Sequence, residues 1–253
     1  MKRYTFRIAV ICTFAVLIVS GIFLVNTSGN RVGHRAEKSY VFMTFLVDDD
    51  IKIDITNDSV ATLTGTVSTW SKRLLAKETV EELSGVKMVV NKLEIEGGQH
   101  AADSDLWIGE KVKNMLMFNR NVNGRKTDVG VQGGVVTLSG EATTKAQKEL
   151  TTTYVMDIEG VTSITNDIVV EKEAGTAAGK VSEYFDDASI TAQVRLALMF
   201  NRLTSSFITN VETKNGLVTL SGNASNNTGK ESAGKLAGDI HGVRDVRNEM
   251  IIR

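Results

Sequence analysis

The chain of 253 residues contains no proline, one cysteine and three histidines. Without proline, its turns depend on Gly, Asn, Asp and Ser. The single cysteine, Cys12, excludes an intramolecular disulfide and a Cys-x-x-Cys pair. The histidines, His34, His100 and His241, are scattered, and no Cys or Asp lies near them at the spacing of a metal site. No Ser-His-Asp arrangement recurs either, so neither a metal centre nor a hydrolase is expected.

The chain also lacks an excess of charge of either sign, because Lys and Arg number 29, Asp and Glu number 30, and the pI is near 6.3. Nucleic-acid binding requires clustered Lys and Arg, so no nucleic-acid partner is expected. The run GTAAGKVS, residues 175–182, is one residue short between its glycines for a phosphate loop, and Val181 stands where Ser or Thr is needed. Asp48–Asp50 lacks the Gly and the distal Glu of a calcium loop. No cofactor is predicted.

The N-terminus carries the longest apolar run. Ile8–Val25 is 18 residues without a charge, and Lys2, Arg3 and Arg7 precede it. As a helix it would be roughly 27 Å long, close to the ~30 Å bilayer core. The basic flank predicts a cytoplasmic N-terminus and an exported remainder. The run exceeds the about 7–15 apolar residues of a signal peptide, which favours a retained anchor within 1–27. Cleavage stays open as the alternative.

The remaining sequence repeats itself. GGVVTLSGEA at 133–142 returns as NGLVTLSGNA at 215–224, and a weaker copy, SVATLTGTV, occupies 59–67. In each copy a Gly-Val follows the motif glycine by 20 residues, and an Asn stands six residues after that second glycine. Matches at identical offsets indicate an internal repeat of about 70 residues. The motif glycines are Gly65, Gly140 and Gly222, the later glycines are Gly85, Gly160 and Gly242, and the asparagines are Asn91, Asn166 and Asn248.

Periodicity within the unit predicts α-β-β-α-β. Apolar residues at helical spacing precede LMFNR at 116–120 and 198–202, and we expect Asp105 and Asp187 to be the N-caps of these helices. A hairpin, a second helix that ends at the later glycine and a closing strand follow. The predicted fold is therefore α+β, with three tandem units after an N-terminal hydrophobic helix. The units span 35–97, where the first helix is degenerate, 103–172 and 182–253, with a linker at 173–181.

A unit built on GxVTLSG, with GVxxVxN 20 residues later, resembles the BON domain, the bacterial osmotically inducible Y and nodulation domain. The resemblance implies an envelope protein similar to osmotically inducible periplasmic proteins and to outer-membrane-associated lipoproteins. Those proteins have two copies, so a third copy is a departure, as is the absence of a lipid-attachment cysteine. The family is associated with phospholipid surfaces, and some members with chaperone-like behaviour. No catalytic residues accompany the fold, so no enzyme is expected.

The recurring glycines and asparagines are interpreted as structural. Each motif glycine ends a strand. A backbone conformation that a Cβ would obstruct explains the need for glycine there more simply than an anion-binding site does. The later glycines are expected to end helices, and the asparagines to hydrogen-bond turns.

Two tryptophans are candidates for membrane contact. Trp70 aligns with polar residues in the other copies, so it should lie near the surface beside cationic side chains. An exposed indole next to cations suits a lipid headgroup interface. The alternative is that these rings pack against the sheet or a neighbouring repeat. The candidate lipid-binding residues are Trp70, Lys72, Arg73, Lys77 and Trp107.

The sequence thus predicts a non-enzymatic envelope protein that binds phospholipid surfaces and supports envelope integrity under osmotic stress. Its predicted location is the periplasm, either anchored to the inner membrane by residues 8–25 or released after cleavage. Two alternatives stay open: a periplasmic holdase for unfolded proteins, and a structural module that recruits an envelope protein complex.

Overall fold

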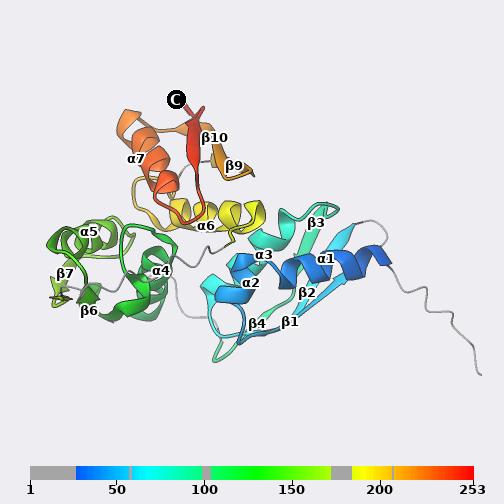
Figure 1. Ribbon diagram of the computed structural model, residues 1–253, viewed down its shortest axis with the longest axis horizontal. Coiled ribbons are helices and arrows are strands. Elements are labelled where there is room, and N and C mark those ends of the chain that lie inside the picture. Colours follow the sequence, from blue (N-terminus) through cyan, green and yellow to red (C-terminus); the bar gives the residue numbers. More distant parts are fainter. Residues whose placement is uncertain (1–26, 57–58, 99–103, 172–183, 207) are drawn as a thin grey trace, which may run out of the picture.

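Figure 1 shows the computed structural model, which describes residues 27–56, 59–98, 104–171, 184–206 and 208–253. Three four-stranded sheets lie in sequence order along the chain, one in each repeat, so the predicted α+β repeat fold is confirmed. The predicted anchor, 8–25, and the linker, 173–181, lie outside the described residues. Within the described ranges, no helix is long and apolar enough to cross a membrane.

The three repeats share one order of helix, hairpin, helix and two short strands, although repeat 1 begins with two helices and repeat 2 has an additional 3-10 turn. Repeat 1 comprises α1 (Thr27–Glu37), α2 (Tyr40–Thr44), β1 (Asp50–Ile55), β2 (Val60–Val67), α3 (Trp70–Glu81), β3 (Met88–Asn91) and β4 (Glu94–Ile95). Repeat 2 comprises α4 (Asp105–Phe118), the 3-10 turn η1 (Gly124–Lys126), β5 (Thr127–Gln132), β6 (Val135–Ala142), α5 (Lys145–Met156), β7 (Ser163–Asn166) and β8 (Val169–Val170). Repeat 3 comprises α6 (Asp187–Phe200), β9 (Ile208–Lys214), β10 (Leu217–Ala224), α7 (Asn227–Gly238), β11 (Asp245–Asn248) and β12 (Ile251–Ile252).

Each sheet is built around the strand that carries the repeated motif. In repeat 2, β6 pairs antiparallel with β5 through a hairpin and parallel with β7 and β8, which the chain reaches through α5. A parallel return requires such a crossover, which is why the second helix is present. Alternate residues of the central strand point to the helices and are buried in all three repeats: Ala61, Leu63 and Val67; Val136, Leu138 and Ala142; Val218, Leu220 and Ala224.

The hairpin turns are held by aspartates in a role that differs from the prediction. The N-caps of α4 and α6 are Ser104 and Asp186, one residue earlier than expected. Asp105 instead accepts hydrogen bonds from the N–H groups of Gly133 and Gly134, at 2.8 and 2.9 Å. Asp187 does the same for residues 215 and 216. The carboxylate thus ties the first helix to the turn of its own hairpin.

The repeated asparagine divides the closing strand, which was predicted as continuous, into two short strands. The Asn166 amide donates to the Lys148 carbonyl of α5 at 2.9 Å, and its side-chain oxygen accepts from the Ile168 N–H at 3.1 Å. Asn91 and Asn248 make the equivalent pair of bonds in their repeats. The asparagine side chain therefore supplies hydrogen bonds where the pairing of the strand is interrupted. It also connects the strand to the second helix. The second helices also end earlier than predicted; α5 stops at Met156, four residues before Gly160.

The degenerate first helix of repeat 1 is two short helices. The Ser39 hydroxyl donates to the Ala36 carbonyl at 2.7 Å and caps α2 through the Phe42 N–H. A capping serine at this position ends α1 and starts α2, which explains the poor helical spacing in the sequence. The first two N–H groups of α2 are bound by repeat 3: Tyr40 donates to the Asp186 carboxylate at 2.7 Å and Val41 to the Ser189 hydroxyl at 3.0 Å.

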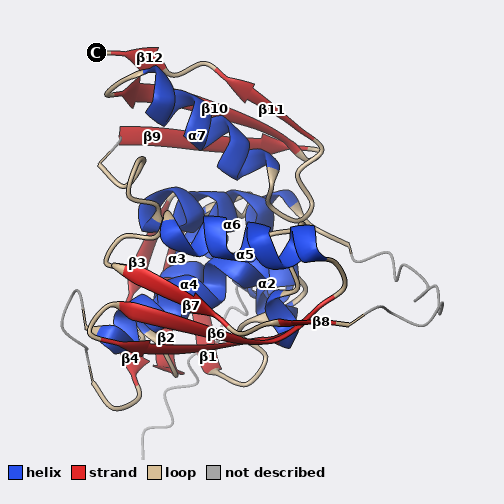
Figure 2. Ribbon diagram, turned by 90° about the vertical axis from the view of Figure 1, so that its left-hand side faces the viewer, coloured by secondary structure: helices blue, strands red, loops and turns tan. Residues whose placement is uncertain are grey.

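Helices occupy the middle of the molecule and the sheets lie outside them (Figure 2). The helix α6 contacts α3, α4 and α7, so all three repeats surround it. Eleven of its 14 residues are buried. A helix that contacts neighbours on most of its faces needs small and apolar residues all round, and the sequence DASITAQVRLALMF meets this requirement.

Candidate functional site: the contacts between repeats and their cavities

Repeats 2 and 3 are joined by a reciprocal contact that we call the FNR clamp. The backbone of residues 118–120 pairs with residues 239–241, and that of 200–202 pairs with 157–159, through the antiparallel bridges Asn119–Ile240 and Ile158–Asn201. Four backbone hydrogen bonds of 2.8–2.9 Å complete the two halves. Each FNR sequence therefore binds the end of the second helix of the other repeat. The motif LMFNR recurs because the same contact is made twice.

The arginine side chains of the clamp bind the turn after that helix. Arg202 donates to the carbonyls of Ile158 and Val161, at 3.1 and 2.9 Å. Arg120 donates to the carbonyls of Ile240 and Val243 in the same way. A guanidinium offers several donors in a fixed fork, so one arginine side chain can bind two carbonyls of this turn at once.

One half of the clamp has an additional polar cluster around Asp239. Its carboxylate accepts from the Tyr154 hydroxyl at 2.7 Å, the Asn121 amide at 2.8 Å and the Lys235 ammonium at 2.9 Å. Burial alone would lower the pKa of Lys235, but the hydrogen bonds to Asp239 and Tyr154 outweigh it and raise the pKa above its ordinary value. The ammonium of Lys235 also contacts the Tyr154 hydroxyl at 3.3 Å and therefore reinforces the contact between repeats 2 and 3.

Repeat 1 is attached through two series of aromatic contacts. Trp70 of repeat 1 contacts Trp107 of repeat 2 edge-to-face, with ring centroids 4.5 Å apart. Trp107 in turn contacts Phe200 of repeat 3, with ring centroids 5.5 Å apart. The second series links Phe118 of repeat 2 to repeat 1 and then to repeat 3. Its members are Phe118, Phe45, Tyr40, Phe185 and His241, in that order.

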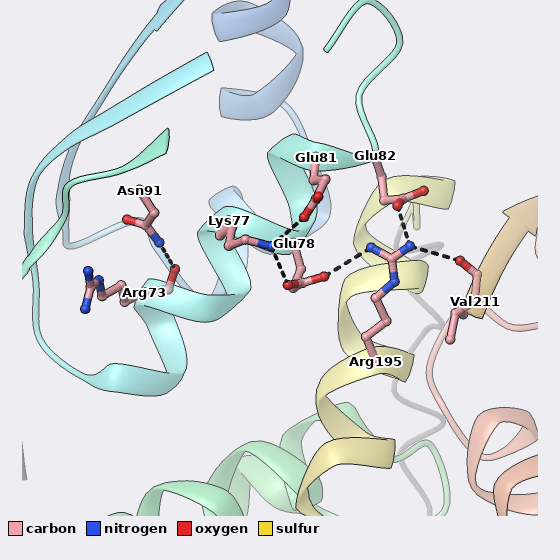
Figure 3. Close-up of polar contacts among 8 residues, drawn as sticks. All are labelled: Arg73, Lys77, Glu78, Glu81, Glu82, Asn91, Arg195 and Val211. Carbon is pink, nitrogen blue, oxygen red and sulfur yellow. Dashed lines mark hydrogen bonds and ion pairs between the residues drawn. The ribbon is translucent and has the colours of Figure 1, made fainter. Parts of the chain in front are cut away.

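An ion-pair network crosses between α3 and α6 (Figure 3). Arg195 pairs with Glu78 at 3.1 Å and Glu82 at 2.6 Å, and also donates to the Val211 carbonyl at 3.2 Å. All three ionised side chains are less than 25% exposed, so the pairs are screened less than surface pairs. Arg195 therefore joins repeat 1 to both the helix and the sheet of repeat 3.

Two cavities lie at equivalent places in repeats 2 and 3, each between the end of the first helix and the following loop. The larger, about 310 Å³, is lined by Leu198, Met199 and Thr204 of repeat 3 and is closed by Leu74 and Glu78 of repeat 1. The smaller, about 220 Å³, is lined by the aligned residues Leu116, Met117 and Val122 and is closed by Tyr40 and His241. Repeat 1 thus covers both cavities.

The smaller cavity contains a buried donor without an acceptor. Asn119 is fully buried and its side-chain oxygen accepts from the Asn121 N–H at 2.8 Å, but its amide nitrogen has no partner among the described residues. Such a group costs about 1–3 kcal/mol unless something in the cavity bonds to it.

The predicted lipid-binding residues divide into two groups. The structure brings Trp70 and Trp107 together at the first turns of α3 and α4, where both remain partly exposed. The contact between their rings is packing against a neighbouring repeat, which was the alternative to membrane contact. Leu106, which the sequence analysis passed over, lies beside Trp107 in the sequence and is 62% exposed. An apolar residue on the polar side of an amphipathic turn was the signal that could have identified it.

The predicted cations are mostly paired within the protein. Lys72 lies 2.9 Å from Asp49, and Lys77 contacts Glu78 and Glu81 at 3.0 and 2.5 Å. Burial alone would lower the pKa of Lys77, but hydrogen bonds to Glu81 and Glu78 outweigh it and raise the pKa. Arg73 extends away from this network (Figure 3) and has no carboxylate partner within the described part of the chain.

The motif glycines adopt a conformation that excludes side chains. Gly65, Gly140 and Gly222 have φ of +114°, +115° and +116°. A Cβ on Gly140 would lie 1.9 Å from the carbonyl oxygen of Lys126, the residue just before β5, and one on Gly65 would lie 2.0 Å from the Asp50 carbonyl oxygen. The glycines let the central strand approach its neighbour at this point. In the described ranges, no three His, Cys, Asp or Glu side chains gather as a metal site.

Comparison with known proteins agrees with this repeat structure. The model of the BON domain matches residues 42–97, 104–172 and 186–253. The chain therefore belongs to the BON domain family and carries three copies of the domain. It is similar to Osmotically-inducible protein Y of Escherichia coli (strain K12), with 30% identity over 175 residues, which cover 68% of this chain and 83% of that protein.

Two solved structures align with much of the chain but superpose poorly. The C-terminal domain of CdsD, a structural protein of the type III secretion system of Chlamydia trachomatis, is 17% identical and aligns over 87% of this chain and 96% of its own, with a TM-score of 0.23. The periplasmic domain of PrgH is 10% identical over 82% of this chain and 97% of its own, with a TM-score of 0.21. Superpositions at these scores support no conclusion about function.

Proposed function

We propose that this chain is an exported, non-enzymatic envelope protein whose BON repeats contact phospholipid surfaces and support the envelope under osmotic stress. Family membership, the likeness to an osmotically inducible protein and the apolar N-terminal run at residues 8–25 support this role. The run would either anchor the protein in the inner membrane or direct it to the periplasm before removal.

The observation that carries the proposal is the apolar surface at the first turns of α3 and α4. Trp70 and Trp107 are both partly exposed there, and Leu106 is 62% exposed. Indoles and an exposed leucine insert at the level of lipid headgroups, where the apolar part of each side chain leaves water. Arg73, on the first turn of α3, supplies attraction to anionic lipid, because Lys72 and Lys77 are neutralised by carboxylates.

We expect Leu106→Glu to weaken binding to vesicles of phosphatidylglycerol and phosphatidylethanolamine by roughly tenfold, because it places a charge where the leucine would insert into the lipid. The measurement is co-sedimentation of residues 27–253 at low salt, with circular dichroism to verify the fold. Met88→Glu is the matched control, since Met88 is 52% exposed on the sheet of repeat 1 and should not contact lipid. Equal binding by both variants, or no binding by the parent protein, would count against the proposal.

A second candidate function, as a holdase, is favoured by the outermost strands. Val169 and Val170 of β8 are 58% and 40% exposed, and Ile251 and Ile252 of β12 are 49% and 48% exposed. Within the described residues each strand pairs on one side only. An apolar strand with a free edge can accept an extended segment of another protein.

If the chain is a holdase, the double substitution Val169→Lys and Ile251→Lys should lower its suppression of client aggregation several-fold, because charged edge strands resist pairing. Light scattering from a heated client protein measures this. Vesicle binding should not change. Unaltered suppression in the double variant would exclude these edges as the client site.

A further inference from the structure

The larger cavity lies where repeat 1 covers repeat 3, between α3, the end of α6 and the strand β9. Its volume is about 310 Å³. Apolar side chains form much of its wall, among them Leu74 of α3, Leu198 and Met199 of α6, and Val211 of β9. A mainly apolar cavity of this size, with a few polar groups, is typical of sites for small organic molecules.

The cavity is open because the loop after the first helix differs between repeats 2 and 3. In repeat 2, Gly124 approaches the helix so closely that a Cβ on it would lie 2.3 Å from the Leu116 carbonyl oxygen. The aligned residue in repeat 3 is Ser206, whose side chain excludes so close an approach. There the Thr204 hydroxyl instead donates to the Leu198 carbonyl at 2.6 Å. The loop therefore lies differently in repeat 3, and the cavity is about 310 Å³ rather than about 220 Å³.

The different loop also leaves a buried hydroxyl of the cavity wall without a partner. Thr127 and Thr209 are equivalent, because each pairs with the motif glycine of its own repeat. The Thr127 hydroxyl donates to the Asn123 carbonyl at 2.8 Å. The hydroxyl oxygen of Thr209 is buried, lines the cavity and has no hydrogen-bond partner among the described residues. An unbonded buried hydroxyl is unfavourable, so an occupant that bonds to it gains affinity.

The charged groups beside the cavity are already paired with one another. Arg195 contacts Glu78 at 3.1 Å and Glu82 at 2.6 Å. Lys77 contacts Glu78 at 3.0 Å and Glu81 at 2.5 Å. Two cations thus face three carboxylates, so an anionic ligand would be repelled, and a cationic one would have to displace an existing ion pair. The cavity therefore favours an uncharged ligand.

We propose that this cavity binds a small uncharged aliphatic molecule with an alcohol or carbonyl oxygen, which accepts a hydrogen bond from the Thr209 hydroxyl while the chain packs on Leu74 and Leu198. An apolar cavity of about 150 Å³ holds benzene, so about twice that volume suits roughly eight to twelve carbon atoms. The ligand is distinct from the bilayer of the proposed function, because a phospholipid carries two long chains and a charged headgroup.

The test is photolabelling of the full-length protein, in an uncharged detergent, with an eight-carbon alcohol that carries a diazirine. Mass spectrometry of the labelled peptides locates the site. We expect labelling to be concentrated in α3, α6 and β9, and 1-octanol to displace it saturably. Octanoate should need at least about tenfold higher concentration for the same displacement, because its charge is repelled. Phosphatidylglycerol added to the same micelles should not displace the label.

A pair of variants tests the hydrogen bond. Thr209→Val keeps the shape of the side chain, removes the hydroxyl and should lower the labelling of these elements by about three- to tenfold. Thr127→Val is the matched control: it removes the equivalent hydroxyl from repeat 2 and should change the labelling less than about twofold. Circular dichroism verifies that both variants fold. Labelling spread evenly over the chain, labelling that 1-octanol does not displace, or equal labelling of Thr209→Val and the parent protein would overturn the proposal.

Discussion

Gly140→Ala is expected to lower the free energy of unfolding by about 3–5 kcal/mol. Gly140 has a φ of +115°, a conformation that L side chains rarely adopt. A Cβ there would lie 1.9 Å from the Lys126 carbonyl oxygen, which belongs to backbone and cannot rotate away. The substitution must therefore separate β6 from β5 at the start of their ladder, where Gly140 pairs with Thr127. Urea denaturation monitored by circular dichroism measures the loss.

The same sheet offers a matched control at Gly130. A Cβ on Gly130 would meet nothing within 4 Å, and its φ is not positive. Gly130→Ala should therefore leave the stability within about 1 kcal/mol, and reduced flexibility of the unfolded chain should make the change slightly favourable. If both substitutions cost the same, the close approach of the strands at Gly140 is not what makes glycine necessary.

The repeat fold could be predicted from sequence because its determinants are local. A glycine at a fixed offset, a Gly-Gly or Asn-Gly turn and alternating apolar residues each specify a short segment. The error at Asp105 was also local in origin. An aspartate at the start of a helix suggests a cap, but its partners, Gly133 and Gly134, are 28 and 29 residues away. Periodicity carries no information on contacts at that distance.

The arrangement of the repeats could not be predicted, although the sequence held a signal. LMFNR occurs in repeats 2 and 3 and is missing from repeat 1. Within one unit the fold does not require Asn-Arg after an apolar helix, so its conservation between two copies indicated a contact made by those copies alone. Trp70 illustrates the opposite difficulty. Its alignment with polar residues correctly indicated a position at the surface of the unit, but the partner, Trp107, belongs to the next unit.

The clamp makes repeats 2 and 3 depend on each other for stability. A unit of about 70 residues has a small core, and burial against neighbours supplies part of its stability. Phe118 and Phe200 are the largest fully buried side chains, at 0% and 1% exposure, and both lie in the clamp. Among the described residues, the two largest fully buried side chains thus lie at contacts between repeats.

Phe200→Ala is therefore expected to lower the free energy of unfolding by about 3–5 kcal/mol and to divide one cooperative transition into two. The ring lies 5.5 Å from Trp107, and the Phe200 carbonyl accepts from the Glu159 N–H at 2.9 Å, so the resulting cavity opens where repeats 2 and 3 meet. Urea denaturation followed by tryptophan fluorescence reports on repeats 1 and 2, since Trp70 and Trp107 are the two tryptophans of the chain. Circular dichroism reports on all three repeats, and the two signals should separate.

Two control variants identify the cause. Phe200→Leu keeps most of the volume and should cost less than about 2 kcal/mol without dividing the transition. Leu220→Ala removes a fully buried side chain from the core of repeat 3, away from the clamp, and should cost about 2–5 kcal/mol while fluorescence and circular dichroism still coincide. Two outcomes would show that the repeats are not coupled through the clamp: separate signals for Leu220→Ala as well, or coincident signals for Phe200→Ala. In either case, loss of stability in repeat 3 would have the same effect wherever it arises.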